Sequence, residues 1–130
     1  MLTIIALLTI AQTGVSPASS AAPTIQDEII VIGRKLRNWR GSLKTKGGAT
    51  RCVTKKSTGD HDIDQIGCDA MVTCFPKFEG EFRAVLSASR DKISRNSMNA
   101  EISQRLAACV EERHNKLKEA LADRRAAGLS

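Results

Sequence analysis

With 130 residues, the chain has room for one small domain. Its formal net charge is +6 at pH 7, and one tryptophan, three phenylalanines and no tyrosine exclude a core built on aromatic packing. The sequence holds two histidines and neither a G-x-S-x-G nor an H-E-x-x-H motif, so we expect a protein that is not an enzyme.

The first 22 residues have the pattern of a secretory signal peptide. Residues 2–11 form an apolar run of about ten residues, which suits a signal sequence and is about half of what a spanning helix needs. Small residues follow, with Ser19 and Ala21 at the −3 and −1 positions of a cleavage site. We therefore expect cleavage near Ala21 or Ala22 and a periplasmic or secreted protein. It would have one domain over residues 23–130 and no transmembrane span.

The first half of that domain has the pattern of β-strands. Residues 28–32 form a β-branched run that ends at Gly33, as is typical of a buried strand. Residues 42–46 and 49–55 flank Gly47-Gly48, which can supply the positive φ values of a two-residue hairpin turn. Together these segments predict a three-stranded antiparallel meander within residues 28–56.

The second half has the pattern of helices. Asp62 can N-cap a helix that Pro76 should end or kink. Residues 78–86 indicate a second helical segment, and Asn99 can cap a third. Three strands followed by three helical segments within residues 62–125 predict the α+β class.

The four cysteines, Cys52, Cys68, Cys74 and Cys109, predict two disulfides, because an exported chain with an even number of cysteines normally pairs them. Cys68 and Cys74 lie six residues apart on one predicted helix and so point to different faces, which prevents their pairing. We prefer Cys52–Cys68 with Cys74–Cys109. The pairing of Cys52 with Cys74 and of Cys68 with Cys109 stays open.

Metals and cofactors find little support in the sequence. The run Asp60-x-Asp62-x-Asp64 begins like a calcium loop, but Gln65 and Met71 occupy the positions where an EF-hand needs glycine and glutamate. There is no C-x-x-C pair, which argues against a zinc site and against a thioredoxin-type redox role. We expect no cofactor and no metal.

Positive charge gathers in the first half of the domain, where residues 29–59 hold nine lysines and arginines and no acidic residue. Such a basic sheet could attract an anionic partner, with a tryptophan adding apolar contact. The candidate surface is Arg34, Lys35, Arg37, Trp39, Arg40, Lys44, Lys46, Lys55 and Lys56. Two other interpretations stay open: the charges are a solvated face that protects an edge strand, and Trp39 is a core residue.

The segment of residues 27–33, DEIIVIG, resembles the TonB box of outer-membrane TonB-dependent receptors, a short stretch that TonB captures by strand addition. The resemblance implies an alternative function, a protein-interaction module that uses its first strand for β-augmentation.

A longer pattern is similar to a set of small exported proteins of alphaproteobacteria. It comprises EIIVIGRKLRNWRG at residues 28–41, Arg51-Cys52, STGD at 57–60, IDQIGC at 63–68, and Cys109 ahead of residues 112–114. The resemblance implies a periplasmic location and no particular activity.

The function that we expect is therefore a small exported, non-catalytic binding or envelope-associated protein. Its anionic partner would be a lipid phosphate, an acidic glycan or an acidic protein, and we do not expect nucleic acid. The β-augmentation module is the alternative, and a small periplasmic hydrolase ranks third. The sequence leaves the oligomeric state open.

Overall fold

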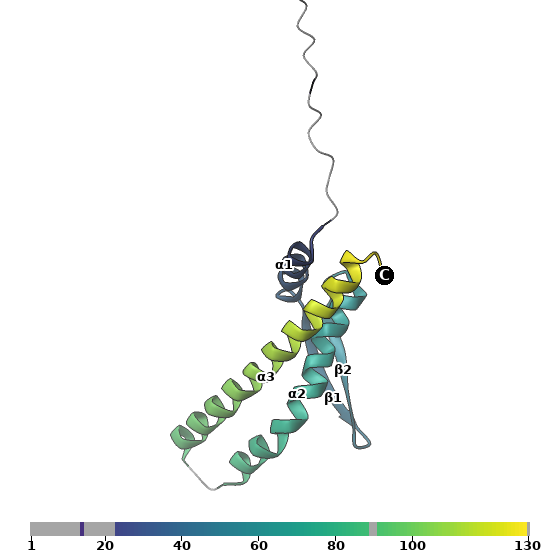
Figure 1. The fold of residues 1–130 in the computed structure, drawn as a ribbon. Coiled ribbons are helices and arrows are strands. Elements are labelled where there is room, and N and C mark those ends of the chain that lie inside the picture. The colour runs from purple at the N-terminus through teal and green to yellow at the C-terminus, as the bar shows by residue number, and fades with distance from the viewer. Residues whose placement is uncertain (1–13, 15–22, 89–90, 130) are drawn as a thin grey trace, which may run out of the picture.

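A computed structural model describes residue 14, residues 23–88 and residues 91–129. The expected signal peptide thus lies outside the described residues, apart from Gly14. The fold is α+β, with elements in the order α1 (Ile25–Leu36), β1 (Arg40–Lys46), β2 (Ala49–Lys56), α2 (His61–Ser87) and α3 (Lys92–Ala126) (Figure 1). In the described part of the chain, no helix is both long enough and apolar enough to cross a membrane.

The segment predicted as the first strand is the helix α1, so that prediction is wrong. Thr24 begins the helix with a capping box: its hydroxyl accepts from the backbone N–H of Asp27, and the Asp27 carboxylate accepts from the backbone N–H of Thr24. Ile32 and Leu36, one turn apart, are buried on the same side. Capping and helical spacing outweigh the β-propensity of the isoleucines and valine. The sheet is therefore a two-stranded hairpin and not a three-stranded meander.

The hairpin itself is confirmed. β1 and β2 pair in antiparallel register from Lys46↔Ala49 outward, with Gly47 (φ 61°) and Gly48 (φ 79°) as the two turn residues. Two successive positive φ values are the requirement of a type I′ turn, which glycine meets without strain.

The two long helices differ from the predicted segments at their boundaries. Asp60, rather than Asp62, caps α2 and accepts from backbone N–H groups in the first turn. Pro76 lies inside α2, so the segments before and after it form one helix. α3 begins at Lys92, capped by Asp91, well before Asn99. Pro76 removes one backbone hydrogen bond, and ion pairs with α3 lie on both sides of it, at Asp69 and at Glu81.

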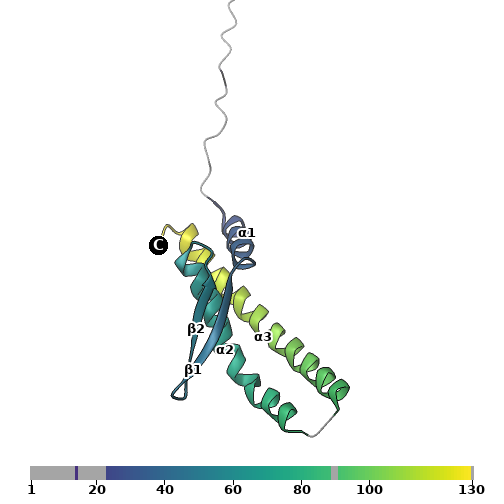
Figure 2. The ribbon, with the colours of Figure 1, turned by 180° about the vertical axis from the view of Figure 1, so that it is seen from behind.

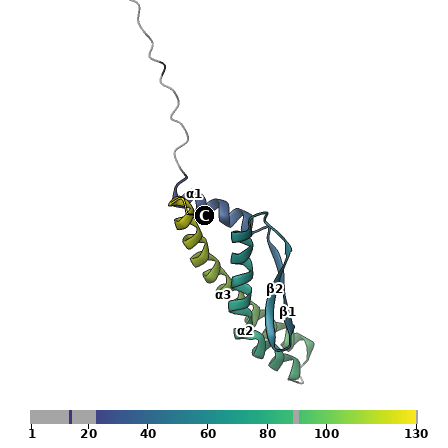
Figure 3. The same cartoon turned by 90° about the vertical axis from the view of Figure 1, so that its right-hand side faces the viewer.

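α2 is the central element of three layers. The hairpin covers one side of α2, and α3 runs antiparallel along another side. α1 crosses the end of this helix pair at which α3 ends (Figures 2 and 3). Both preferred disulfides are confirmed: Cys52–Cys68 joins the hairpin to α2, and Cys74–Cys109 joins α2 to α3.

The main core lies where α1, α2 and α3 meet, and Trp39 closes it from the hairpin side. Trp39 is 8% exposed, and its indole N–H donates to the Thr54 hydroxyl at 3.2 Å. Its ring lies against two glycines: a Cβ on Gly41 or Gly67 would approach ring atoms to 2.3 or 2.4 Å. Both positions therefore need glycine for the ring to pack. The remaining members of the core are Ile32, Leu36, Ile63, Ile66, Leu121 and Ala122.

Candidate functional site

The register of the hairpin sorts its side chains onto two faces. Residues directly opposite each other share a face, and neighbours along a strand alternate. Cys52 and Thr54 face α2, because Cys52 is bonded to Cys68 and the Thr54 hydroxyl lies 3.8 Å from the Cys68 sulfur. The register therefore places Ser42, Lys44, Lys46, Ala49, Arg51 and Val53 on the face away from α2. Lys55, next to the irregularity in the register, is assigned to this face by alternation along β2.

Four cations dominate this outer face and form what we call the hairpin cation cluster: Lys44, Lys46, Arg51 and Lys55, all exposed. Lys44 is directly opposite Arg51, so their side chains leave the strands about 5 Å apart, and Lys46 follows about 7 Å along β1. Within the described chain, none of the four pairs with a carboxylate. Like charges directly opposite repel each other, so an anion is the natural complement of this face.

Sequence reasoning left Arg51 out of the candidate surface. The sequence nevertheless contains the information needed to include it. A two-residue turn at Gly47-Gly48 fixes the register and places residue 51 opposite residue 44. Arg51 therefore belongs with Lys44 on one face, although seven positions separate them in sequence.

The predicted residues on α1 lie apart from the cluster. Arg34, Lys35 and Arg37 are exposed at the C-terminal end of α1. Positive charge at that end interacts favourably with the helix dipole, which gives Arg34 and Lys35 a structural role in the domain. The structure does not bring these three residues onto the outer face of the hairpin.

The predicted residues at the start of the hairpin have other partners. The Arg40 guanidinium folds back and donates to the carbonyl oxygens of Arg37 at 2.8 Å and Trp39 at 2.7 Å. Lys56 lies opposite Arg40, where the register is irregular. Trp39 is buried, so it supplies no exposed surface for stacking. This confirms the interpretation of Trp39 as a core residue.

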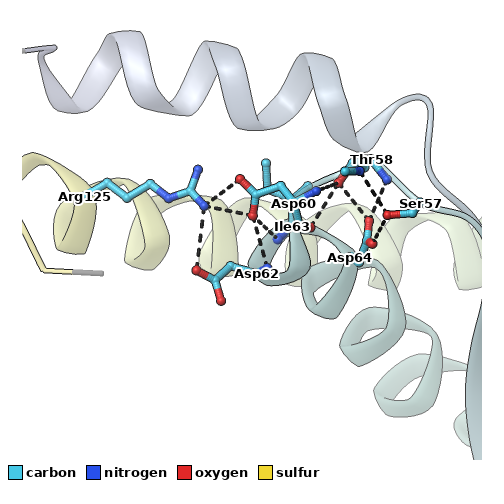
Figure 4. Close-up of polar contacts among 8 residues, drawn as sticks. Ser57, Thr58, Asp60, Asp62, Ile63, Asp64 and Arg125 are labelled. Atoms are coloured by element: carbon cyan, nitrogen blue, oxygen red, sulfur yellow. Dashed lines mark hydrogen bonds and ion pairs between the residues drawn. The ribbon is translucent and has the colours of Figure 1, made fainter.

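A polar network joins the segment after β2 to the start of α2 and the end of α3 (Figure 4). The Asp64 carboxylate accepts from the backbone N–H and the hydroxyl of Thr58, both at 2.8 Å, and from the Ser57 hydroxyl. Asp60 accepts from the Arg125 guanidinium at 2.8 and 2.9 Å. The junction thus connects the end of β2, the start of α2 and the end of α3.

The acids of this junction stay ionised at neutral pH. Burial disfavours the charged form of Asp60, but hydrogen bonds from Arg125 and from the backbone N–H of Ile63 outweigh it and hold the pKa of Asp60 below its ordinary value. Burial also opposes ionisation of Asp64, and hydrogen bonds from Ser57 and Thr58 likewise lower its pKa. Neither carboxylate forms an ion pair with a residue of the hairpin cation cluster.

Residues that could serve metals or catalysis are dispersed. Across residues 23–88 and 91–129, no group of three or more His, Cys, Asp or Glu side chains is placed to hold a metal ion. His61 lies beside Gln65 on the first turn of α2, with the two Nε2 atoms 3.2 Å apart. Burial, and then the charge of Lys118, lower the pKa of His114, whose Nε2 is buried without a hydrogen-bond partner among the described residues.

The chain matches no protein-family model, no curated protein and no solved structure. No catalytic family is therefore identified for it.

Proposed function

We propose that this protein is a small exported, non-catalytic binding or envelope-associated protein that holds an anionic partner on the hairpin cation cluster. One observation carries the proposal: four exposed cations lie on one face, and no described carboxylate pairs with them. Coulomb attraction to such a face raises the local concentration of anions and speeds their association.

Two disulfides in a domain of this size support export. Cys52–Cys68 and Cys74–Cys109 account for all four cysteines. Such bonds form and persist in oxidising compartments such as the periplasm and the extracellular space. The signal pattern in residues 1–22 agrees with this compartment and stays a prediction.

The position of the TonB-box-like segment argues against β-augmentation as a second function. The TonB-box-like residues 27–33 lie within α1, where helical hydrogen bonds engage the backbone. Strand addition at that segment would require α1 to unfold and Ile32 to leave the core.

The test is a fourfold variant of the cluster, in which Lys44, Lys46, Arg51 and Lys55 are replaced by serine. At low ionic strength the wild type should bind heparin, used as a soluble polyanion, and the variant should bind at least about tenfold more weakly. The affinity of the wild type should also fall between low and physiological salt, as the screening length shortens to about 8 Å. Binding can be measured by titration calorimetry.

A matched control removes the same number of positive charges elsewhere. Replacing Lys77, Arg83, Lys116 and Arg124 by serine changes four exposed cations on α2 and α3. This control should keep most of the affinity. Equal losses in the two variants would mean that binding follows net charge rather than the cluster. A wild type that does not bind heparin at low salt would contradict the proposal outright.

A further inference from the structure

The facing ends of α2 and α3 expose large apolar side chains. Leu86, at the end of α2, is 76% exposed, and Ile93, at the start of α3, is 82% exposed. These are the highest exposures among the large apolar side chains of the described residues. Both lie at the end of the molecule that is farthest from α1 (Figure 1). We call Leu86 and Ile93 the apolar tip.

A cavity lies between the two helices near their facing ends. It is open, has a volume of about 350 Å³, and combines apolar side chains such as Val85, Met98 and Ile102 with the charged Glu81, Glu101 and Arg105. Val85 and Ile102 are 2% and 5% exposed, so they form the inner apolar wall. Leu86 and Ile93 do not line this cavity, so the apolar tip consists of these two exposed side chains.

Two unpaired cations flank the tip. Lys92 and Arg95, on the first turn of α3, make no ion pair with a carboxylate in residues 23–88 or 91–129. The nearby Asp91 caps α3 and accepts from the backbone N–H and hydroxyl of Ser94 at 2.9 and 3.0 Å. Lys92 and Arg95 therefore leave positive charge beside the apolar tip.

The other acids near this end are paired or set back. Glu79 pairs with Arg83 at 2.9 Å, and Glu81 pairs with Arg105 at 2.8 Å. Glu101 has no ion-pair partner among the described residues, but it lies about 12 Å along α3 from Ile93.

The hairpin points toward the same end of the molecule. β1 leads away from α1, and the hairpin turn lies toward the same end of the molecule as the end of α2, although apart from it (Figure 1). Lys44, Lys46 and Arg51, which belong to the hairpin cation cluster, lie within four residues of the turn glycines. One end of the protein therefore carries an apolar projection and two groups of cations.

We infer that the anionic partner is the surface of a lipid bilayer, an inference that rests on the proposed function and specifies its partner. Leu86 and Ile93 enter the boundary between headgroups and acyl chains, while Lys92, Arg95 and the three cluster residues near the turn, Lys44, Lys46 and Arg51, contact lipid phosphates. A bilayer offers both an apolar phase and negative charge at one surface. A soluble polyanion offers only the charge and would leave the apolar tip in water.

The first experiment measures co-sedimentation of the oxidised protein with vesicles of equal parts phosphatidylglycerol and phosphatidylcholine. Replacing Leu86 and Ile93 by serine should weaken partitioning by at least about tenfold, because the variant loses only the apolar contribution. The matched control replaces Val31 and Val72 by serine. These valines are 44% and 39% exposed and lie away from the tip, so the control should partition like the wild type. Both double variants should bind heparin with unchanged affinity.

The outcomes separate the two proposals. If the Leu86→Ser/Ile93→Ser variant partitions like the wild type, or if the wild type binds heparin but not the vesicles, the lipid inference is overturned and the anion-binding function stands. If the cluster variant binds heparin as tightly as the wild type, the proposed function is overturned.

A second measurement reports insertion directly. In a Leu86→Trp variant, the new indole should start in water, and its emission should shift to shorter wavelength when the anionic vesicles are added. Trp39 is buried, so its contribution should not change. A Val72→Trp variant, on the same helix, should show no shift. Unshifted emission from the Leu86→Trp variant at saturating vesicles would overturn insertion of the tip.

Discussion

At the level of single residues, two glycines decide how the hairpin meets the helices. Trp39 packs its ring against the backbones of Gly41 and Gly67, and Thr54 accepts from its indole N–H. Gly67 lies inside α2, where glycine is usually unfavourable for a helix. The close approach of the ring explains why it is tolerated there.

This contact predicts opposite effects for the same substitution at two positions of α2. Gly67→Ala should lower the free energy of unfolding by about 1–3 kcal/mol, because the new Cβ would lie 2.4 Å from the Trp39 ring. Gly80→Ala should raise it by about 0.5–1 kcal/mol, because nothing lies within 4 Å of that Cβ and alanine favours the helix. Urea unfolding followed by circular dichroism measures both. An unchanged Gly67→Ala variant would contradict the packing of Trp39.

Some of these residue-scale features could be predicted from the sequence. The Gly47-Gly48 turn and the preferred disulfides follow from local chemistry: a short glycine turn, and a strand and helix joined through a few residues. The burial of Trp39 could not be decided, since it depends on Gly67, which is far along the chain. The place of Arg51 opposite Lys44 could have been predicted as well, because the two-residue turn fixes the register of the hairpin.

At the level of elements, α2 holds the molecule together through one disulfide to each neighbouring layer. Cys52–Cys68 spans 16 residues in sequence and fastens the hairpin. Cys74–Cys109 spans 35 residues and fastens α3, with Cys74 fully buried. The two bonds therefore constrain different parts of the fold.

Removing either disulfide should destabilise the protein to a different extent. Loop entropy predicts a loss of about 3 kcal/mol for the Cys52→Ala/Cys68→Ala variant and about 4 kcal/mol for Cys74→Ala/Cys109→Ala. The first variant should also bind heparin more weakly while keeping its helical circular dichroism, because the hairpin loses its bond to α2. Denaturation midpoints and calorimetry provide the two measurements. A larger loss of unfolding free energy in the first variant than in the second would show that loop-closure entropy does not determine how much each disulfide stabilises the protein.

Two elements differ from the predictions, each for its own reason. Residues 28–32 have strand composition, but Ile29, Ile32 and Leu36 also follow helical spacing, and Thr24 and Asp27 form a capping box. Pro76 normally ends a helix, yet α2 continues because Cys74–Cys109 and other contacts with α3 hold it. The spacing and the capping residues of α1 are visible in the sequence, so this helix could have been predicted. The contacts that hold α2 together around Pro76 depend on packing against α3, which sequence alone does not show.

At the level of the whole molecule, ion pairs and a disulfide connect α2 to α3 along their length. Arg125 contacts Asp60, Arg113 contacts Asp69 at 2.7 Å, and Arg105 contacts Glu81, with Cys74–Cys109 between the last two. The hydrogen bond from Arg113 lowers the pKa of Asp69, although burial partly opposes it.

These lowered pKa values predict that the protein loses stability in acid. The carboxyls of Asp60, Asp64 and Asp69 ionise more readily in the folded than in the unfolded protein. Their contribution is therefore fully present above the ordinary pKa of 3.8 and is lost as pH falls through the lowered folded values, where the unfolded state binds more protons. Urea midpoints at pH 7, 5 and 3 should decrease mainly between the last two.

The Arg125→Met variant tests the assignment of this effect. It should be less stable than the wild type at pH 7, since Asp60 loses the guanidinium, and the difference should shrink at pH 3. A difference that is the same at both values would place the pH dependence elsewhere in the protein.

The position of the described chain ends bears on how the protein can be handled. α1, which begins two residues after Pro23, and the end of α3 lie together, opposite the apolar tip (Figure 1). An affinity tag or a fluorescent fusion placed after α3 would therefore lie on the side that the proposed surface does not use. If the protein is immobilised on a sensor through its C-terminus, the hairpin cation cluster should face the solution and be free to meet vesicles or heparin.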